Sequence, residues 1–339
     1  MDWIHLHNKL REYLPANKAE YEKNVKEQDV KQHIHPTDKI TISGEDSVQE
    51  TTPQETAEPE ETLEELMEKL NSLIGLSGVK DEVNSLVNML KIKKMRDARG
   101  MKTANISKHL VFLGNPGTGK TTVARLLSKI YKQLGVLEKG QLVEVDRAGL
   151  VAGFVGQTAL KTKEKIDEAM GGILFIDEAY TLAKGGNDFG QEAIDTILKA
   201  MEDNRENLVV IVAGYPDPME TFLDSNPGLK SRFSKSIMFE DYSDTELFSI
   251  FQGFCKPYTM SLTMDSQKAV TVYLQWLVQH KSANFANGRE MRNLFEAAVT
   301  NQANRLSALS KVTDDELNEI KTEDLPSYVL NNPVTSANP

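Results

Sequence analysis

A glycine-rich stretch near residue 114 has the composition of a phosphate-binding loop. Residues 114–122 read GNPGTGKTT, which matches the pattern G-x-x-x-x-G-K-[ST]. In such a loop, backbone N–H groups surround phosphate oxygens, and the positive end of the following helix adds to the attraction. Lys120 would reach the β- and γ-phosphates, and Thr121 would ligate Mg²⁺. The candidate nucleotide-binding residues of this stretch are Gly114, Asn115, Pro116, Gly117, Thr118, Gly119, Lys120, Thr121 and Thr122.

Two adjacent carboxylates follow the loop further along the chain. The stretch GGILFIDEAY (171–180) places Asp177 and Glu178 at the end of an apolar run that predicts a buried strand. An aspartate there can hold Mg²⁺ through its water shell, and the neighbouring glutamate can orient or deprotonate an attacking water. The alternative is that the two acids are ordinary solvated turn residues without a role in a site. The presence of the phosphate loop in the same sequence disfavours this alternative. We therefore predict Thr121 and Asp177 as metal ligands and Glu178 as catalytic.

A GTP-specific site is the obvious competing interpretation. Residues 146–149 read DRAG and fit the pattern D-x-x-G. The guanine-selecting pattern N-K-x-D is absent, however, because both Asn-Lys pairs continue differently, as NKLR and NKAE. We therefore expect ATP and Mg²⁺ as the cofactors.

The motifs lie within alternating strand and helix patterns. This alternation is typical of an α/β fold with a parallel sheet flanked by helices. After Asp241 the pattern becomes helical, and Asn287 with Glu290 three residues later predicts a capping box. Five strands are expected in HLVFLG, QLVEV, GILFID, LVVIVAG and SIMF, and three later helices near 244–255, 266–280 and 288–307. The sequence therefore predicts a five-stranded parallel core followed by a small all-helical lid domain.

Charge and composition divide the 339-residue chain into parts. The net charge is −11, but residues 41–68 alone hold ten acids and no base, so the remainder is nearly neutral. Residues 41–61 contain almost nothing apolar and cannot offset the entropy of ordering, which predicts an acidic, flexible linker. We expect an N-terminal extension (1–40), this linker (41–61), a nucleotide-binding domain (62–241), a helical lid domain (242–325) and a C-terminal tail (326–339).

Several kinds of site and location are disfavoured by composition. The longest purely apolar run, Leu208–Ala213, is too short for a membrane span of about 20 residues, so we expect a cytoplasmic protein without a membrane partner. A lone cysteine, Cys255, excludes an intramolecular disulfide and is expected to be buried. The pairs His5/His7 and His33/His35 lack a companion ligand fixed by spacing, so a metal site there is disfavoured.

Taken in order, these motifs resemble those of the AAA+ ATPases of the CbxX/CfxQ family, from about Glu64 to Leu325. The resemblance implies an AAA+ P-loop core, hydrolysis of ATP to ADP and phosphate, and a homohexameric ring with nucleotide at the subunit interfaces. Upstream of the core, LIGLSGVK (73–80) is similar to the family's adenine-side segment, which implies that Ile74 and Gly75 line the base.

The resemblance also implies roles for two arginines and a tyrosine. In NPGLKSRF, Arg232 matches the arginine finger that enters the neighbouring subunit's site, and Lys230 stands where relatives often carry a second arginine. In NGREMRN, Arg289 matches the sensor-2 arginine at the γ-phosphate, with Arg292 as the alternative. Tyr215, at the end of LVVIVAGY, occupies the place where many relatives carry a water-positioning asparagine or threonine.

A lone aromatic side chain stands in the glycine-rich stretch LVAGFVGQTAL (150–160). Without context, Phe154 could equally pack beneath the loop as a small satellite core. In the family this place is the first pore loop, and its pattern of aromatic, aliphatic and glycine is matched by Phe154, Val155 and Gly156. The resemblance implies that this loop grips a protein client in the central channel of the ring. A second glycine-rich loop (184–190) would face the same channel.

Three functions remain open at this point. The first is an ATP-driven remodeller of an unidentified protein client, for which a sporulation protein in the family suggests a role in sporulation. The second is a nucleic-acid motor or loader, supported by KIKKMRDARGMK (91–102) with six bases, although a nearly neutral body makes nucleic acid a poor partner. The third is a regulator that binds nucleotide without hydrolysis, which the presence of Glu178 and Arg232 disfavours.

Overall fold

The computed structural model describes residues 60–331 except 104–106, 155 and 184–188. The expectations for the N-terminal extension, both histidine pairs and most of the acidic linker lie outside the described residues. So do Val155, the first five residues of the second glycine-rich loop and residues 332–339.

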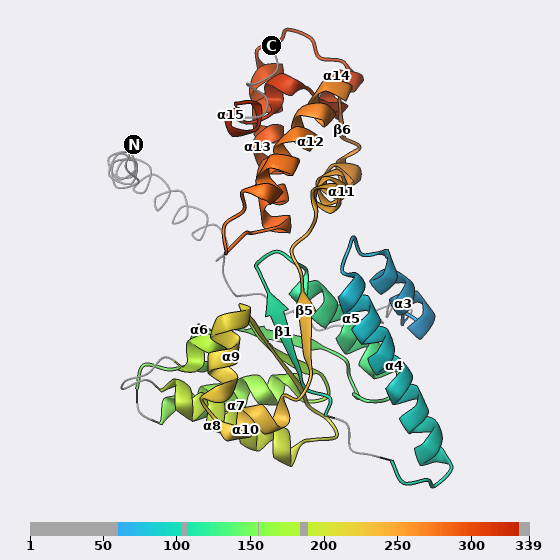
Figure 1. Cartoon of the computed structure of the whole chain (residues 1–339), viewed down its shortest axis with the longest axis vertical. Coiled ribbons are helices and arrows are strands. Elements are labelled where there is room, and N and C mark those ends of the chain that lie inside the picture. Colours follow the sequence, from blue (N-terminus) through green and yellow to red (C-terminus); the bar gives the residue numbers. More distant parts are fainter. Residues whose placement is uncertain (1–59, 104–106, 155, 184–188, 332–339) are drawn as a thin grey trace, which may run out of the picture. The chain divides into compact units, whose positions relative to one another are not determined.

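A five-stranded parallel sheet forms the core, with strand order β2-β3-β4-β1-β5. Its neighbouring strands β1 and β5 are labelled in Figure 1. Ile176 pairs with Val212, and Leu113 pairs with Gly214, so β3, β4 and β1 end together at one edge of the sheet. Ligands of open α/β sheets bind at this carboxyl edge. The predicted strands are confirmed as β1 (Leu110–Gly114), β2 (Leu142–Val145), β3 (Ile173–Ile176), β4 (Val209–Gly214) and β5 (Ser236–Phe239).

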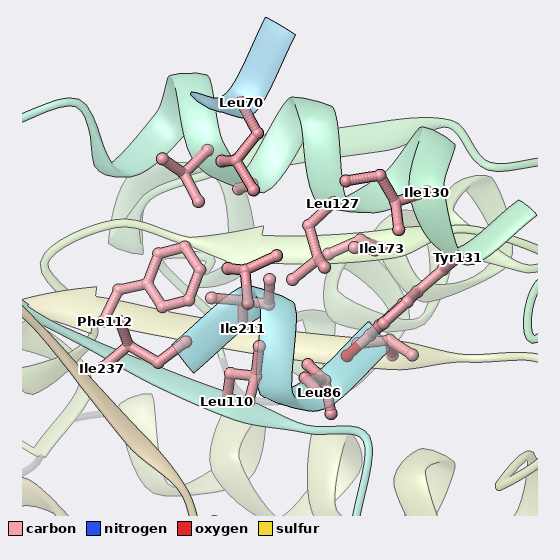
Figure 2. Packing of buried hydrophobic residues seen from close by; sticks show 14 of the residues in the cluster. Leu70, Leu86, Leu110, Phe112, Leu127, Ile130, Tyr131, Ile173, Ile211 and Ile237 are labelled. Carbon is pink, nitrogen blue, oxygen red and sulfur yellow. The ribbon is translucent and has the colours of Figure 1, made fainter. Parts of the chain in front are cut away.

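Helices cover both faces of the sheet because alternate strand residues point to opposite sides. Phe112 and Ile211 face one apolar cluster, and Val111 and Val210 face the other. The first cluster is covered by α3 (Leu63–Ser72), α4 (Ser77–Ala98) and α5 (Lys120–Gln133), and Figure 2 shows its packing. The second is covered by α6 (Arg147–Leu150), α7 (Gln157–Ala169), α8 (Gly190–Asp203), α9 (Pro216–Asp224) and α10 (Pro227–Arg232).

The segment after β5 forms a lid domain around its own apolar cluster. Phe251, Leu274 and Leu294 lie in the cluster, and Cys255 is buried as expected, with its thiol pKa raised to about 11 by burial. The predicted helices are confirmed as α11 (Asp244–Cys255), α12 (Met264–Gln279) and α13 (Gly288–Ser307). Shorter elements complete it: η3 (Lys256–Tyr258), α14 (Asp314–Asn318), η4 (Thr322–Asp324) and α15 (Ser327–Leu330).

The lid domain also holds a small strand pair that the sequence did not predict. β6 (Ser261–Leu262) pairs in parallel with β7 (Glu319–Ile320). The pair is anchored at Ile320, whose carbonyl accepts hydrogen bonds from the Thr263 N–H (3.1 Å) and the Ser266 hydroxyl (2.9 Å). Two residues are too few to show strand periodicity, because a period of two needs about four residues to be seen.

The expected capping box at the start of α13 is wrong. Asn287 precedes the helix with φ 48° and ψ −119°, and its side chain makes no capping hydrogen bond. Its amide instead contacts Asp241, Tyr242 and Phe285, which compete successfully for the same polar atoms. The spacing to Glu290 was therefore coincidental, and Asn287 serves a tertiary contact.

Candidate nucleotide-binding site

The phosphate loop connects β1 to α5 at the carboxyl edge of the sheet. Gly117 and Gly119 have φ of 70° and 92°, in the left-handed region that favours glycine. Lys120 begins α5, and its ammonium donates to the carbonyl oxygens of Gly114 (2.9 Å) and Asn115 (2.7 Å). The loop, the lysine and the N-terminus of a 14-residue helix thus form one electropositive concavity.

The two predicted carboxylates lie at the neighbouring strand end. The Asp177 N–H donates to the Val145 carbonyl (2.9 Å), which continues the pairing of β3 with β2. Glu178 has φ 47°, a strained value for a side chain of this size, and its N–H donates to the Asp177 carboxylate (3.0 Å). The turn therefore fixes the Asp177 carboxylate through the Glu178 N–H.

A cavity of about 840 Å³ joins these elements. It extends from the phosphate loop and the carboxylates to the segment before α4 and to the lid helices α11 and α13. Its volume is in the range of small-molecule sites. The predicted residues that line it are Ile74, Gly114, Pro116, Gly117, Gly119, Lys120, Thr121, Thr122, Asp177, Glu178, Tyr215, Arg289 and the alternative Arg292.

Three other predicted residues support the cavity without lining it. A Cβ at Gly75 would lie 2.4 Å from a carboxylate oxygen of Glu246, so Gly75 permits the close approach of α11. The Asn115 amide donates to Asp241 (2.9 Å). The buried Thr118 hydroxyl donates to the Asn115 carbonyl (2.8 Å) and stabilises the turn of the loop.

The far end of the cavity is apolar and was missed by the sequence analysis. Arg292 lies over the Phe254 ring, with the guanidinium 5.4 Å from the ring centroid, a cation–π arrangement. Ile250 and Phe254 are four residues apart on α11, a spacing that places them on one helix face. The lining residues not predicted are Leu73, Leu76, Gly214, Tyr242, Ile250, Phe254, Ala286, Gly288 and Asn293.

Sequence comparisons agree with this arrangement. Residues 110–241 match the ATPase family associated with various cellular activities (AAA), and residues 243–333 match the AAA lid domain. The chain is 41% identical to stage V sporulation protein K of Bacillus subtilis (78% of this chain, 82% of the relative) and 44% identical to protein CbbX of Cereibacter sphaeroides (73% and 80%). It is 39% identical to the chloroplastic ribulose bisphosphate carboxylase/oxygenase activase of Cyanidioschyzon merolae (82% and 96%). The chain is an AAA+ ATPase of the CbxX/CfxQ type.

Solved structures show the same fold. The AAA domain of FIGL-1 in complex with ADP superposes with a TM-score of 0.54 at 17% identity, covering 75% of this chain and 80% of that one. The AAA+ ATPase thus binds nucleotide and hydrolyses ATP, as its family does. AAA+ proteins generally assemble into rings.

The cavity of this AAA+ ATPase contains suitable ligands for Mg²⁺. Thr121 and Asp177 both line it, and a hydroxyl and a carboxylate are the oxygen donors that Mg²⁺ prefers. No cluster of three or more His, Cys, Asp or Glu side chains suited to a metal occurs among the described residues. A site with one carboxylate and one hydroxyl fits an ion that is also held by substrate phosphates.

Arg232 lies outside the cavity of its own chain. It ends α10, its side chain is 30% exposed, and its guanidinium donates to the Glu202 carboxylate of α8 (2.9 Å). Lys230 is paired with Asp224 (2.7 Å). The structure therefore places neither cation near the phosphate loop of the same chain.

Phe154 projects into solvent between α6 and α7, with 71% of its surface exposed. The loop that carries it is tied at its base, because the Ala152 N–H donates to the Thr158 hydroxyl (3.0 Å). Gly156, with φ 78°, immediately precedes α7 as its N-cap residue. The ring is thus presented by an anchored loop, and the alternative of a satellite core does not describe it.

None of the helices that the structure describes has the length and apolarity needed to cross a membrane.

We expect the ammonium of Lys120 to make nucleotide affinity dependent on pH. Burial lowers its pKa to about 8, an effect that Asp177 opposes and Arg289 reinforces. Bound phosphates favour the charged form of Lys120 and raise its pKa. Below about pH 8 the lysine is therefore protonated both in the free protein and in the nucleotide complex, whereas above about pH 8 it is protonated only in the complex. We expect ADP affinity to be flat below about pH 8 and to fall by up to about tenfold per pH unit above it.

Calorimetry of ADP binding between about pH 7 and 9.5 measures this dependence, in a range where a terminal phosphate with a pKa near 6 is already ionised. Lys120→Arg is the matched control, because a guanidinium stays charged throughout this range. Equal pH dependence in both proteins would show that another group titrates.

Proposed function

We propose that this AAA+ ATPase forms a hexameric ring that remodels a protein client by moving Phe154. The exposure of Phe154 on an anchored, glycine-rich loop carries the proposal. An apolar ring held in solvent has no role in packing its own chain. It suits contact with a polypeptide of variable sequence, because apolar contact is not directional.

The proposed chemistry assigns one task to each polar group of the cavity. The phosphate loop and Lys120 bind the phosphates, and Arg289 contacts the γ-phosphate. Thr121 and Asp177 would hold Mg²⁺, which supplies charge neutralisation on the phosphate oxygens when bound. Glu178 orients and deprotonates the attacking water.

Tyr215 and Tyr180 lie beside Glu178 at the strand ends. Their ring centroids are 6.1 Å apart, and Tyr215 lines the cavity. A phenol can donate or accept a hydrogen bond, so Tyr215 is suited to assist Glu178 in placing the water. We assign to Tyr215 the water-positioning role that an asparagine or threonine has in many relatives.

Arg232 is proposed to act in the neighbouring subunit. It is partly exposed, and it does not line its own cavity. The ion pair with Glu202 holds the guanidinium at the surface of α8 and α10, from which a second copy could approach it. A ring places this surface of one subunit against the site of the next.

A protein client is favoured over nucleic acid by two observations. One relative is named as an activase of another enzyme, ribulose bisphosphate carboxylase/oxygenase. In the basic segment of α4, Lys93 pairs with Asp97 (3.2 Å) and Lys94 donates to the Leu134 carbonyl (3.2 Å), so part of its charge is used within the chain. Stimulation of ATP hydrolysis by DNA or RNA, without stimulation by proteins, would favour the nucleic-acid alternative.

Removing the aromatic ring should abolish client capture without impairing hydrolysis. A Glu178→Gln ring loaded with ATP is expected to retain client proteins from an extract, since it binds ATP without turnover. Adding Phe154→Ala to this variant should reduce the captured protein at least about tenfold, because the central apolar contact of an interface carries most of its energy. In the Phe154→Ala single variant, basal hydrolysis should stay within about twofold of wild type.

Leu160→Ala is the matched control, because Leu160 is a large apolar residue nearby on α7 with a similar exposure of 64%. Undiminished capture by the Phe154→Ala trap would contradict the gripping role. A lowered melting temperature of Phe154→Ala would instead indicate that the ring packs against the fold.

A further inference from the structure

A cluster of polar side chains, of which Asn287 is fully buried, connects the phosphate loop to the lid domain. We call Asn115, Asp241, Lys281 and Asn287 the Asp241 cluster. One carboxylate oxygen of Asp241 accepts hydrogen bonds from the amides of Asn115 (2.9 Å) and Asn287 (2.7 Å). The other oxygen accepts from the Lys281 ammonium (2.7 Å). The cluster thus joins the phosphate loop, the end of β5 and the segment before α13.

Asn287 is fully buried, and both ends of its amide are used. Besides its bond to Asp241, its nitrogen donates to the carbonyls of Phe285 (3.0 Å) and Pro116 (3.4 Å), and its oxygen accepts from the Tyr242 N–H (2.9 Å). Its backbone has φ 48° and ψ −119°, a region that residues other than glycine rarely adopt. A strained residue whose side-chain amide atoms are all paired is held in place by its surroundings.

The main chain makes a second direct link between loop and lid. The Gly288 N–H donates to the Gly117 carbonyl (3.1 Å). A Cβ at Gly117 would lie 2.2 Å from the Ala286 carbonyl oxygen, so only glycine permits this approach. Arg289 is the next residue and lines the cavity. Its position relative to the phosphate loop is therefore set by the residue pair Asn287-Gly288.

The charges of the cluster are balanced. Burial alone would raise the pKa of Asp241, but hydrogen bonds from Lys281, Asn287 and Asn115 outweigh it and hold this pKa below its ordinary value. Asp241 is thus ionised near neutral pH and carries the charge that Lys281 neutralises. A carboxylate at position 287 would be repelled by Asp241. It would also leave the carbonyl oxygens of Phe285 and Pro116 without the hydrogen bonds that the Asn287 amide donates.

We propose that Asn287 and Asp241 are positioning residues for ATP hydrolysis, which hold Arg289 of the lid in register with the phosphate loop. A shift of the phosphate loop is passed to α13 through the Asn287 amide and the Gly288 N–H. The lid and the loop therefore move together when a γ-phosphate is present. This inference rests on the proposed contact of Arg289 with that phosphate.

Asn287→Asp tests the proposal because it keeps the shape of the side chain and removes its two donors. We expect kcat for ATP to fall by about tenfold, while the Kd for ADP, which has no γ-phosphate, changes by less than about threefold. Adding Asp241→Asn to this variant places an amide donor at position 241 opposite the carboxylate acceptor at position 287. The exchanged pair should recover part of the lost kcat. Asn304→Asp, an exposed site on the same helix, is the control that should change neither value.

The combination with Arg289→Ala distinguishes the inference from its premise. Arg289→Ala alone should lower kcat, and Asn287→Asp should then cause less than about a twofold further loss, because residues that act as one unit are not additive. Multiplied losses would overturn the positioning role, as would equal losses of kcat and ADP affinity in Asn287→Asp. An unchanged kcat in Arg289→Ala would instead refute the role of Arg289 itself.

Discussion

Replacing Glu178 with glutamine is expected to lower the kcat for ATP hydrolysis by about 10²–10⁴-fold, the usual contribution of a general base. The amide has the shape of the carboxylate but cannot accept the proton of the attacking water. Asp177 and the phosphate loop are unchanged, so ATP should still bind. Phosphate release measures the turnover, and equilibrium titration with a fluorescent ATP analogue measures the binding.

The strained backbone at Glu178 strengthens this expectation. Glu178 has φ 47°, and its N–H holds the Asp177 carboxylate in place. Glu164→Gln, an exposed residue on α7, provides the same chemical change away from the cavity and should leave turnover unaltered. Near wild-type turnover in Glu178→Gln would assign the water-activating role to another group.

The features that the sequence predicted well are those encoded in one continuous segment. The phosphate loop requires strand, glycines, lysine and helix in succession, and all of them lie within residues 110–133. Asp177 and Glu178 likewise end a short apolar run that forms β3. Local spacing specifies such sites because the atoms that act together are neighbours along the chain.

The features that were missed depend on contacts between distant segments. Tyr242 donates its hydroxyl to the Thr118 carbonyl (3.1 Å), a contact across 124 residues. Asn287 has the local pattern of a helix cap, but tertiary partners in the segment after β5 and in the phosphate loop take its amide instead. No spacing rule indicates such pairs, because the sheet and the lid must both be formed before the atoms meet.

Of the predicted catalytic cations, Lys120 and Arg289 line the cavity of their own chain, and Arg232 lies outside it. Charge that develops on the transferring group is commonly stabilised by an arginine supplied by a partner, with an effect of about 10³–10⁵ on rate. Arg289 comes from the lid of the same chain, and Arg232 lies at a separate surface beside Glu202. A neighbouring subunit could supply Arg232 to this position.

Arg232→Ala should therefore lower kcat by about 10³–10⁵-fold while leaving ATP bound. Lys230→Ala is the matched control, since Lys230 is a cation on the same helix that is paired with Asp224. If Arg232 were needed only for its ion pair with Glu202, then Glu202→Gln would reduce turnover to the same extent.

Mixing two inactive variants separates action between subunits from action within one. A site formed by an Arg232→Ala subunit keeps Glu178, and it regains Arg232 when its neighbour is a Glu178→Gln subunit. Random mixing in equal amounts should thus restore about a quarter of the sites in a ring, where each site meets one neighbour. An arginine that acts within its own chain would give no recovery, because every subunit would lack one of the two groups.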